Sequence, residues 1–194
     1  MRIVAFVMAL FGVPAVALAA AETYKIDPNH TFPNFTINHL GFSTMHGRFG
    51  KTSGTITMDK DKKTGSVDVV IDAASVDTGY GKRDDHLRSP DFLNAVEYPD
   101  ITYKSTKVTL HDNGGATVNG KLTILGVSKP VTLNVDSINC GLNPMDPTKT
   151  KYVCGFNATA KIKRSDFGMN FALPAIGDEM NIELEVEAGR VASK

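Results

Sequence analysis

The strictest pattern in the chain is an alternation of apolar and polar side chains close to its C-terminus. Every second position from 180 to 188 is apolar and the positions between are acidic or polar: Met180, Ile182, Leu184, Val186 and Ala188 alternate with Glu179, Asn181, Glu183, Glu185 and Glu187. Successive side chains of a β-strand point to opposite faces, whereas a helix would mix the two sets around its surface. The segment predicts a strand with one face inward and one face in water.

The same alternation recurs along most of the chain. Cys154, Phe156, Ala158, Ala160 and Ile162 share one face of a second strand, and Val118, Leu122 and Ile124 share one face of a third. Further candidate strands cover residues 31–38, 47–58, 67–72, 101–110 and 131–139, with turn sequences such as Asp112-Asn113-Gly114-Gly115 between them. Roughly eight antiparallel strands of this kind predict an all-β protein whose sheet closes into a barrel.

Residues 78–96 interrupt the alternation. From Asp84 to Leu93 the charges are mixed and no two-residue period remains. This segment predicts one or two short helices beside the barrel.

Length and charge narrow the class of protein further. The chain has 194 residues, a length that corresponds to one domain. Its 21 basic residues (Lys and Arg) balance 21 acidic ones, so no net field attracts a polyanion, and nucleic acid is not expected as a partner.

The N-terminal segment has a different character from the rest of the chain. Residues 3–21 carry no charge, follow Arg2, and end in the small-residue patterns Ala17-Leu18-Ala19 and Ala19-Ala20-Ala21. We therefore expect a signal peptide over residues 1–21, cleaved near residues 19–21, and an exported mature domain over residues 22–194. The alternative is an uncleaved membrane anchor, because an uncharged stretch of about 20 residues can span a bilayer.

Export makes the two cysteines informative. Cys140 and Cys154 are the only pair in the chain, and an isolated pair usually bridges in an oxidising compartment. Residues 141–147 between them are rich in turn formers, so a disulfide would close the base of a long hairpin. Metal binding by the two sulfurs is the alternative, but no Cys-x-x-Cys spacing or neighbouring His supports it.

Several positions on the predicted inner faces are small: Ala116, Gly120, Ala158 and Ala160. Small residues inside a barrel either fit its taper or leave volume, and eight strands can enclose side chains alone or a single ligand. The pattern favours a cavity and leaves a filled barrel open.

Short motifs follow one another along nearly the whole mature chain. They are Tyr24-x-Ile26-Asp27-x-x-His30, Phe35-x-Ile37-x-His39-Leu40-Gly41, Gly47-x-Phe49, Ile71-Asp72-x-x-Ser75-Val76-Asp77-Thr78, Arg83-Asp84-x-His86-Leu87, Asp91-Phe92-Leu93, Tyr98-Pro99-x-Ile101, Val118-x-Gly120-x-Leu122-Thr123-Ile124-x-Gly126-Val127-x-Lys129-Pro130-Val131, Arg164-x-Asp166-Phe167-Gly168-Met169 and Ile176-Gly177-Asp178-Glu179. In this order they resemble the YceI-like family of secreted lipid-binding proteins. The Cys140–Cys154 hairpin lies outside the family's general pattern.

The resemblance implies an extended, eight-stranded, antiparallel lipocalin-like barrel. Its hydrophobic tunnel would hold a polyisoprenoid chain, such as an isoprenoid quinone precursor or a polyprenyl phosphate, in the periplasm. A strand of about ten residues rises about 30 Å, which is long enough for an extended alkyl chain. Burial at about 0.8 kcal/mol per carbon lets the tail supply affinity, and polar groups are then needed only at the tunnel mouth.

The residues predicted to contact the lipid come from several strands and from the helical segment. They are Phe35, Ile37, His39, Phe49, Arg83, Val118, Gly120, Leu122, Phe156, Ala158, Ala160, Ile182 and Leu184. No cofactor other than the bound lipid and no metal site are expected. The expected partners are the long-chain lipid and, transiently, a membrane, with a homodimer as a further alternative.

The polar residues leave other functions open. The spacings of His30, His39 and His46 match no known metal signature. His39 is the favoured head-group contact and Arg83 an anion contact at the barrel opening, while Arg164 and Asp166 are expected to secure the turn before Phe167. Beside a lipid carrier, the alternatives are an enzyme that acts on an isoprenoid lipid through His39, Arg83 or His86, and a filled barrel that binds a protein partner.

Overall fold

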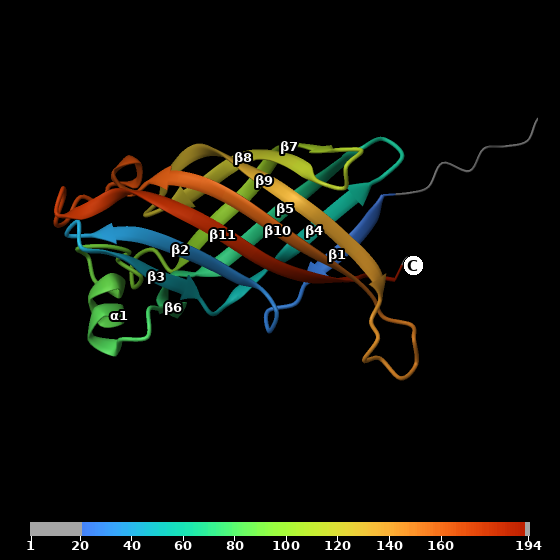
Figure 1. Ribbon diagram of the computed structural model, residues 1–194, viewed down its shortest axis with the longest axis horizontal. Coiled ribbons are helices and arrows are strands. Elements are labelled where there is room, and N and C mark those ends of the chain that lie inside the picture. The colour runs from blue at the N-terminus through green and yellow to red at the C-terminus, as the bar shows by residue number, and fades with distance from the viewer. Residues whose placement is uncertain (1–20, 193–194) are drawn as a thin grey trace, which may run out of the picture.

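The computed structural model describes residues 21–192 and shows an elongated β-barrel with one short α-helix (Figure 1). Residues 1–20 of the predicted signal peptide lie outside the described part of the chain. The strands are β1 Glu22–Ile26, β2 Phe32–His39, β3 Ser43–Phe49, β4 Thr52–Asp59, β5 Thr64–Asp72, β6 Val76–Asp77, β7 Asp100–Leu110, β8 Ala116–Ile124, β9 Val127–Leu142, β10 Tyr152–Lys163 and β11 Ile176–Arg190. The helices are α1 Gly81–Arg88 and two 3-10 turns, η1 Ala73–Ser75 and η2 Arg164–Phe167.

The eleven strands build an eight-stranded antiparallel barrel because three of its strands are interrupted. β1 and β2 lie end to end and pair on one side with β11 and on the other with β4 and β3, which also lie end to end. β5 and β6 continue the order against β4 and β3. The strands β7 to β11 are continuous, and β11 returns to β1 and β2 to close the ring. The predicted closed all-β barrel is confirmed.

Two local features differ from the sequence expectation. Residues 47–58 were expected as one strand, but β3 ends at Phe49 and β4 begins at Thr52. At this break the backbone amides of Gly50 and Lys51 turn aside and donate to the carbonyl and hydroxyl oxygens of Ser75, at 3.0 and 3.1 Å. The short strand β1 was not expected, although its buried Tyr24 and Ile26 already alternate with exposed neighbours.

The barrel has two dissimilar ends (Figure 1). At one end, here called the α1 end, lie α1, the β2–β3 and β8–β9 turns and the β10–β11 loop. The β8–β9 turn is a two-residue hairpin loop in which Leu125 and Gly126 both have positive φ, 53° and 71°, as type I′ turns require. The opposite end, here called the hairpin end, carries the β4–β5 and β7–β8 turns and the long β9–β10 hairpin.

The predicted disulfide between Cys140 and Cys154 is present. The two residues face each other across the β9–β10 ladder, below the hairpin tip. Within the tip, the buried Asp146 carboxylate accepts hydrogen bonds from the backbone amides of Thr148, Thr150 and Lys151. These bonds hold its pKa well below the usual range. The hairpin is therefore tied both by a covalent bond and by a buried acceptor.

The predicted short helix is confirmed as α1, and its composition is unusual for a helix that packs on a barrel. Its only buried residue is Asp84. Among the described residues, no helix has the length and apolar character needed to cross a membrane. Leu87 is the one apolar residue of α1 that packs against the core, and polar bonds described below supply the other contacts that hold α1 to the barrel.

Candidate functional site

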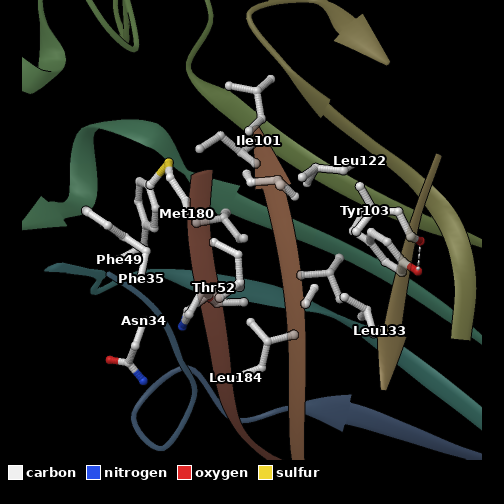
Figure 2. Close-up of a pocket in the computed structure, with 18 of the residues that line it drawn as sticks. Asn34, Phe35, Phe49, Thr52, Ile101, Tyr103, Leu122, Leu133, Met180 and Leu184 are labelled. Atoms are coloured by element: carbon white, nitrogen blue, oxygen red, sulfur yellow. Dashed lines mark hydrogen bonds between the residues drawn. The ribbon is translucent and has the colours of Figure 1, made fainter. Parts of the chain in front are cut away.

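A cavity of about 420 Å³ runs inside the barrel. Its lining reaches from Ile26 and Met58 near the hairpin end to Arg83 and Phe171 at the α1 end. Between these limits the wall is built almost entirely of aliphatic and aromatic side chains that the alternating strands point inward (Figure 2). An interior of this kind favours hydrocarbon over polar solutes.

The structure brings the residues predicted to contact the lipid together in this cavity, with one exception. Those that line it are Phe35, Ile37, His39, Phe49, Arg83, Val118, Leu122, Phe156, Ala158, Ala160, Ile182 and Leu184. Thr159, on the other face of β10 from Ala160, is exposed, as the alternation requires. The ligand contacts themselves stay a prediction.

The exception is Gly120, which does not line the cavity because the Tyr103 ring covers it. A Cβ built on Gly120 would lie 2.5 Å from Cζ of Tyr103, so only glycine leaves room for this ring against β8. The same arrangement occurs in the opposite wall, where a Cβ on Gly47 would lie 2.3 Å from Cζ of Phe35. Each glycine therefore leaves room for an aromatic ring that lines the cavity.

Tyr103 is a buried polar residue in the apolar wall. Its hydroxyl lies 3.0 Å from the carbonyl oxygens of both Val118 and Val131, so its single proton is shared between two acceptors (Figure 2). Desolvation raises the pKa of Tyr103 to about 12. The hydroxyl group therefore bonds to the backbone of the wall, and the ring of Tyr103 lines the cavity.

Thr52 is a second polar residue of the wall, and its side chain is unsatisfied. Thr52 is 4% exposed and its Oγ1 lacks a hydrogen-bond partner among the described residues. It lines the cavity at the start of β4 (Figure 2). A buried hydroxyl without a partner carries a desolvation cost, which a ligand atom can relieve.

Polar side chains of the cavity collect at the α1 end. His39 comes from β2, Thr78 follows β6, and Arg83 and His86 come from α1. The predicted head-group residues His39 and Arg83 are therefore brought to one mouth, together with Thr78 and His86. His46 is exposed and, by the alternation of β3, belongs to its outer face. This mouth can accept a polar or anionic group while the wall accepts a tail.

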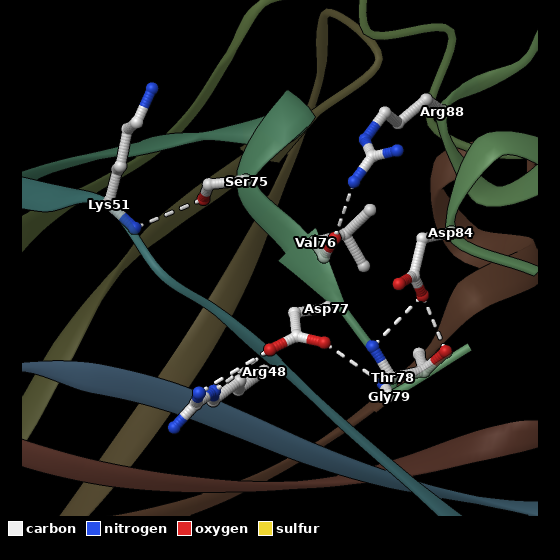
Figure 3. A network of polar contacts seen from close by, with 9 residues as sticks. All are labelled: Arg48, Lys51, Ser75, Val76, Asp77, Thr78, Gly79, Asp84 and Arg88. Carbon is white, nitrogen blue, oxygen red and sulfur yellow. Dashed lines mark hydrogen bonds and ion pairs between the residues drawn. The ribbon is translucent and has the colours of Figure 1, made fainter. Parts of the chain in front are cut away.

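Arg83 is held at the mouth by Thr78. Its Nε donates to Oγ1 of Thr78 and one Nη donates to the Thr78 carbonyl oxygen, both at 2.7 Å, while the other Nη lies 3.6 Å from the sulfur of Met45. The hydroxyl and backbone amide of Thr78 in turn donate to the buried Asp84 (Figure 3). Among residues 21–192 the guanidinium has no carboxylate partner, and one of its Nη groups faces only the weak acceptor sulfur of Met45.

Further polar contacts fasten the end of α1 and the segment that precedes the helix. Arg88 donates to the carbonyl oxygens of Ala74 and Val76, at 2.7 and 3.0 Å, and Arg48 contacts Asp77 at 3.4 Å (Figure 3). The Gly79 amide also donates to Asp77 (Figure 3). This backbone bond is the main cause of the lowered pKa of Asp77. Together these bonds hold α1 over the cavity mouth.

Arg164 is buried beneath the mouth and secures the β10–β11 loop, as predicted. It is 2% exposed and donates to the carbonyl oxygens of Gly177, Met169 and Ile176 at 2.7–3.0 Å. Burial lowers the pKa of its guanidinium. The expected partner Asp166 is exposed, and Asp178 supplies the carboxylate of this turn by accepting from the amide and hydroxyl of Ser165. The prediction that Asp166 secures this turn is therefore wrong. Asp178 of β11 holds the turn, whereas Asp166 lies within η2 and is exposed.

An aromatic cluster closes one side of the mouth. The rings of His86, Phe92 and Phe171 pack edge to face with centroid separations of 5.0–5.4 Å. His86 also contacts the Asp91 carboxylate at 2.8 Å. Sequence reasoning placed Phe92 in a family motif but missed Phe171, because it lies in a loop without periodicity.

Sequence reasoning also missed Met45, Thr52 and Tyr103 as lining residues. Tyr103 shares a face with Ile101, two residues before it, but the β-bulge between Ser105 and Lys107 breaks the two-residue period between Tyr103 and Val108. Thr52 is polar, so no apolar pattern could place it inside. Within residues 21–192, no group of three or more His, Cys, Asp or Glu side chains is arranged to hold a metal ion.

Comparisons with known proteins agree with this geometry. A family model described as "YceI-like domain" matches residues 24–188. Protein YceI of Escherichia coli O157:H7 is 41% identical over 172 residues, which cover 87% of this chain and 87% of that protein. The crystal structure of Burkholderia cenocepacia BcnA has a TM-score of 0.72 and 26% identity, covering 84% of this chain and 99% of the other. A polyisoprenoid binding domain from Saccharophagus degradans shares the fold, with a TM-score of 0.61 and 20% identity over 85% of this chain and 97% of the other.

Proposed function

Because the chain belongs to the YceI-like family, we propose that it is a periplasmic binding protein that carries a polyisoprenoid or similar long-chain lipid, such as an isoprenoid quinone or its precursor, in the barrel cavity. The observation that carries this proposal is the distribution of polarity in the cavity. Its wall is apolar along the barrel, and its polar groups other than Thr31, Asn34, Thr52 and Tyr103 gather at the α1 end. The Saccharophagus degradans domain, which shares the fold, is a polyisoprenoid binding domain and supports the same ligand class.

In this proposal the tail lies along the strands and the head lies among the mouth residues. Each buried carbon contributes about 0.8 kcal/mol before ordering costs are subtracted, so the tail supplies most of the affinity. Arg83 and His39 orient the head, with His86 beside them. The protein selects its lipid by tail length and by the polarity of the head.

The geometry also weighs on the two alternatives. A cavity of about 420 Å³ disfavours the filled barrel. For an enzyme, the mouth offers His86 with Asp91 as a base and its orienting acid, but the nearby Thr78 hydroxyl is engaged by both Asp84 and Arg83. Turnover of an added isoprenoid lipid, followed by mass spectrometry, would favour the enzyme.

The test is extraction of the exported protein with organic solvent, followed by mass spectrometry of the extract and of the intact protein. We expect about one long-chain lipid per chain, and a mass that lacks residues 1 to about 19–21. Absence of lipid from protein prepared under mild conditions would contradict the carrier. A full precursor in washed membranes would contradict the periplasmic assignment.

A matched pair of variants locates the lipid. Ala160→Phe fills part of the cavity from the inner face of β10, so we expect it to reduce lipid occupancy several-fold while the protein remains folded. Thr159→Phe adds the same ring to the outer face of that strand and should leave occupancy unchanged. Undiminished occupancy in folded Ala160→Phe protein would show that the lipid binds elsewhere.

A further inference from the structure

Large apolar side chains are exposed on separate loops of the α1 end. Phe42 in the β2–β3 turn is 89% exposed and Val96, after α1, is 96% exposed. Leu40, Tyr80, Val127 and Phe171 are less exposed members of the same set. We call these six residues the apolar rim.

Three members of the apolar rim, Leu40, Tyr80 and Phe171, lie beside the opening of the cavity. Phe171 belongs both to the rim and to the cavity lining. The Leu40 amide donates to the Ala175 carbonyl oxygen at 2.9 Å and so joins the β2–β3 turn to the β10–β11 loop. Tyr80 lies against the guanidinium of Arg83, which lines the cavity. Through Phe171 the apolar wall of the cavity continues to the solvent-exposed rim at the same end of the barrel.

The outer wall of the barrel has the opposite character. The outward positions of β11, for example, are Glu183, Glu185 and Glu187, all of which are exposed. Several large apolar side chains exposed at one end of a protein and bordered by polar surface mark a contact site for a protein or a membrane. Here they come from several separate turns and loops and from the first residue of β9, beside the mouth of a cavity lined by hydrocarbon, which favours a fluid apolar layer over a rigid partner.

Charge at this end does not select an oppositely charged partner. Helix α1 and the segment after it present the exposed Lys82 together with Asp85, Asp91 and Glu97. Because both signs are present, electrostatic attraction to an anionic protein or nucleic acid is not the basis of recognition. The hydrophobic effect is left as the driving force.

We propose that the α1 end docks on the surface of a lipid bilayer, with Phe42 and Val96 inserted as anchors at the level of the acyl chains. The inference rests on the proposed function, since docking would place the cavity mouth where a long-chain lipid can pass between membrane and barrel without crossing water. An amphiphilic surface binds at the bilayer interface through its buried apolar area. Binding is therefore expected to depend weakly on salt.

The test uses the mature protein and vesicles of phosphatidylcholine, separated by flotation. We expect the wild type to float with the vesicles at low and high salt, and Phe42→Ser with Val96→Ser together to reduce partitioning by about ten-fold per side chain, the factor that corresponds to about 1.4 kcal/mol. The matched control is Met145→Ser, because Met145 is 86% exposed but lies in the β9–β10 hairpin at the opposite end. This control should bind vesicles as the wild type does.

Several outcomes would overturn the proposal. They are absence of wild-type binding, equal binding by the rim variant, and loss of binding in Met145→Ser. A wild-type dimer that becomes a monomer in the rim variant, without vesicle binding, would instead make the rim an interface between two copies. Lipid content is measured on the same samples. If the protein carries lipid but does not bind vesicles, only the docking proposal is refuted. If the protein carries no lipid, the proposed function is refuted.

Discussion

At the scale of single residues, the buried hydroxyl of Thr52 is expected to lower the free energy of unfolding of the lipid-free protein. Replacing Thr52 by Val keeps the side-chain shape and removes a buried oxygen that has no partner among the described residues. In lipid-free protein we expect Thr52→Val to raise the free energy of unfolding by about 1 kcal/mol, because the desolvation cost disappears. Chemical denaturation measures this difference.

The comparison with lipid-loaded protein shows whether the ligand uses the same hydroxyl. If the lipid places a polar atom against Thr52, the variant binds it more weakly although its lipid-free form is more stable. Thr57→Val is a control on the same strand, because its hydroxyl already pairs with Ser66 at 2.7 Å in an exposed position. A Thr52→Val protein that is less stable than the wild type would contradict the expectation.

The buried phenol of Tyr103 makes the free energy of unfolding depend on pH in the alkaline range. Its pKa is raised to about 12 from an ordinary value of 10.0, so the folded state holds the phenol proton more tightly than the unfolded chain does. This contribution to stability is fully present below pH 10 and is lost as the pH rises from about 10 to about 12. We expect the wild type to lose stability steeply across this window.

Tyr103→Phe should flatten that loss, and it should cost about 1 kcal/mol at neutral pH because the hydrogen bonds to Val118 and Val131 are removed. Part of the loss remains, since burial also raises the pKa of Tyr24. Melting curves between pH 8 and pH 12, referred to Tyr80→Phe as an exposed control, measure the difference. Equal pH dependence in the Tyr103 and Tyr80 variants would rule out this role of the buried phenol.

At the scale of elements, the Cys140–Cys154 hairpin is an independent unit of stability. A cross-link that closes a loop of about 15 residues is worth about 3 kcal/mol in the chain-entropy model. We expect the double variant Cys140→Ala, Cys154→Ala to lose up to this amount in urea unfolding. Lipid occupancy should not change, because neither cysteine lines the cavity and the hairpin lies opposite its mouth. Loss of lipid together with stability would show that the hairpin shapes the site.

The elements that sequence reasoning could predict are those in which one physical signal dominates. In β10 and β11 the alternation is complete, so both the strand and its inward residues follow from the chain alone. The break between β3 and β4 depends on amides that turn toward Ser75, a contact between segments 24 residues apart. Such long-range partners leave no periodic trace in the sequence.

The candidate site divides in the same way. The apolar wall could be predicted because inward strand positions define it, whereas Gly120 could not be placed without the Tyr103 ring that covers it. The mouth was predicted only through His39 and Arg83. Its remaining parts, including Phe171 and the Thr78–Asp84 bonds, lie on loops and on a polar helix whose positions tertiary contacts decide.

At the scale of the whole molecule, the barrel is elongated, and most of the polar side chains that line its cavity gather at one end. The cavity lining runs from the mouth at the α1 end to Ile26 and Met58 near the hairpin end. If the head of the lipid is fixed at the mouth, the distance to the hairpin end limits the tail. The barrel then selects lipids by the length of their tails, which a filled core or a shallow cleft could not do.

Ala116 allows this limit to be moved. It is 3% exposed, lines the cavity, and starts β8 directly after the β7–β8 turn at the hairpin end (Figure 1). We expect Ala116→Phe to shorten the longest tail that the protein retains, because the added ring occupies the distal part of the cavity and leaves the mouth intact. Thr117→Phe puts the same ring on the other face of β8 and should retain the wild-type lipids. The measurement is the distribution of tail lengths among extracted lipids after incubation with a mixture of isoprenoids. A uniform decrease of all lengths in Ala116→Phe would mean that the tail is not held head-at-the-mouth, and an unchanged distribution would mean that it never reaches the hairpin end.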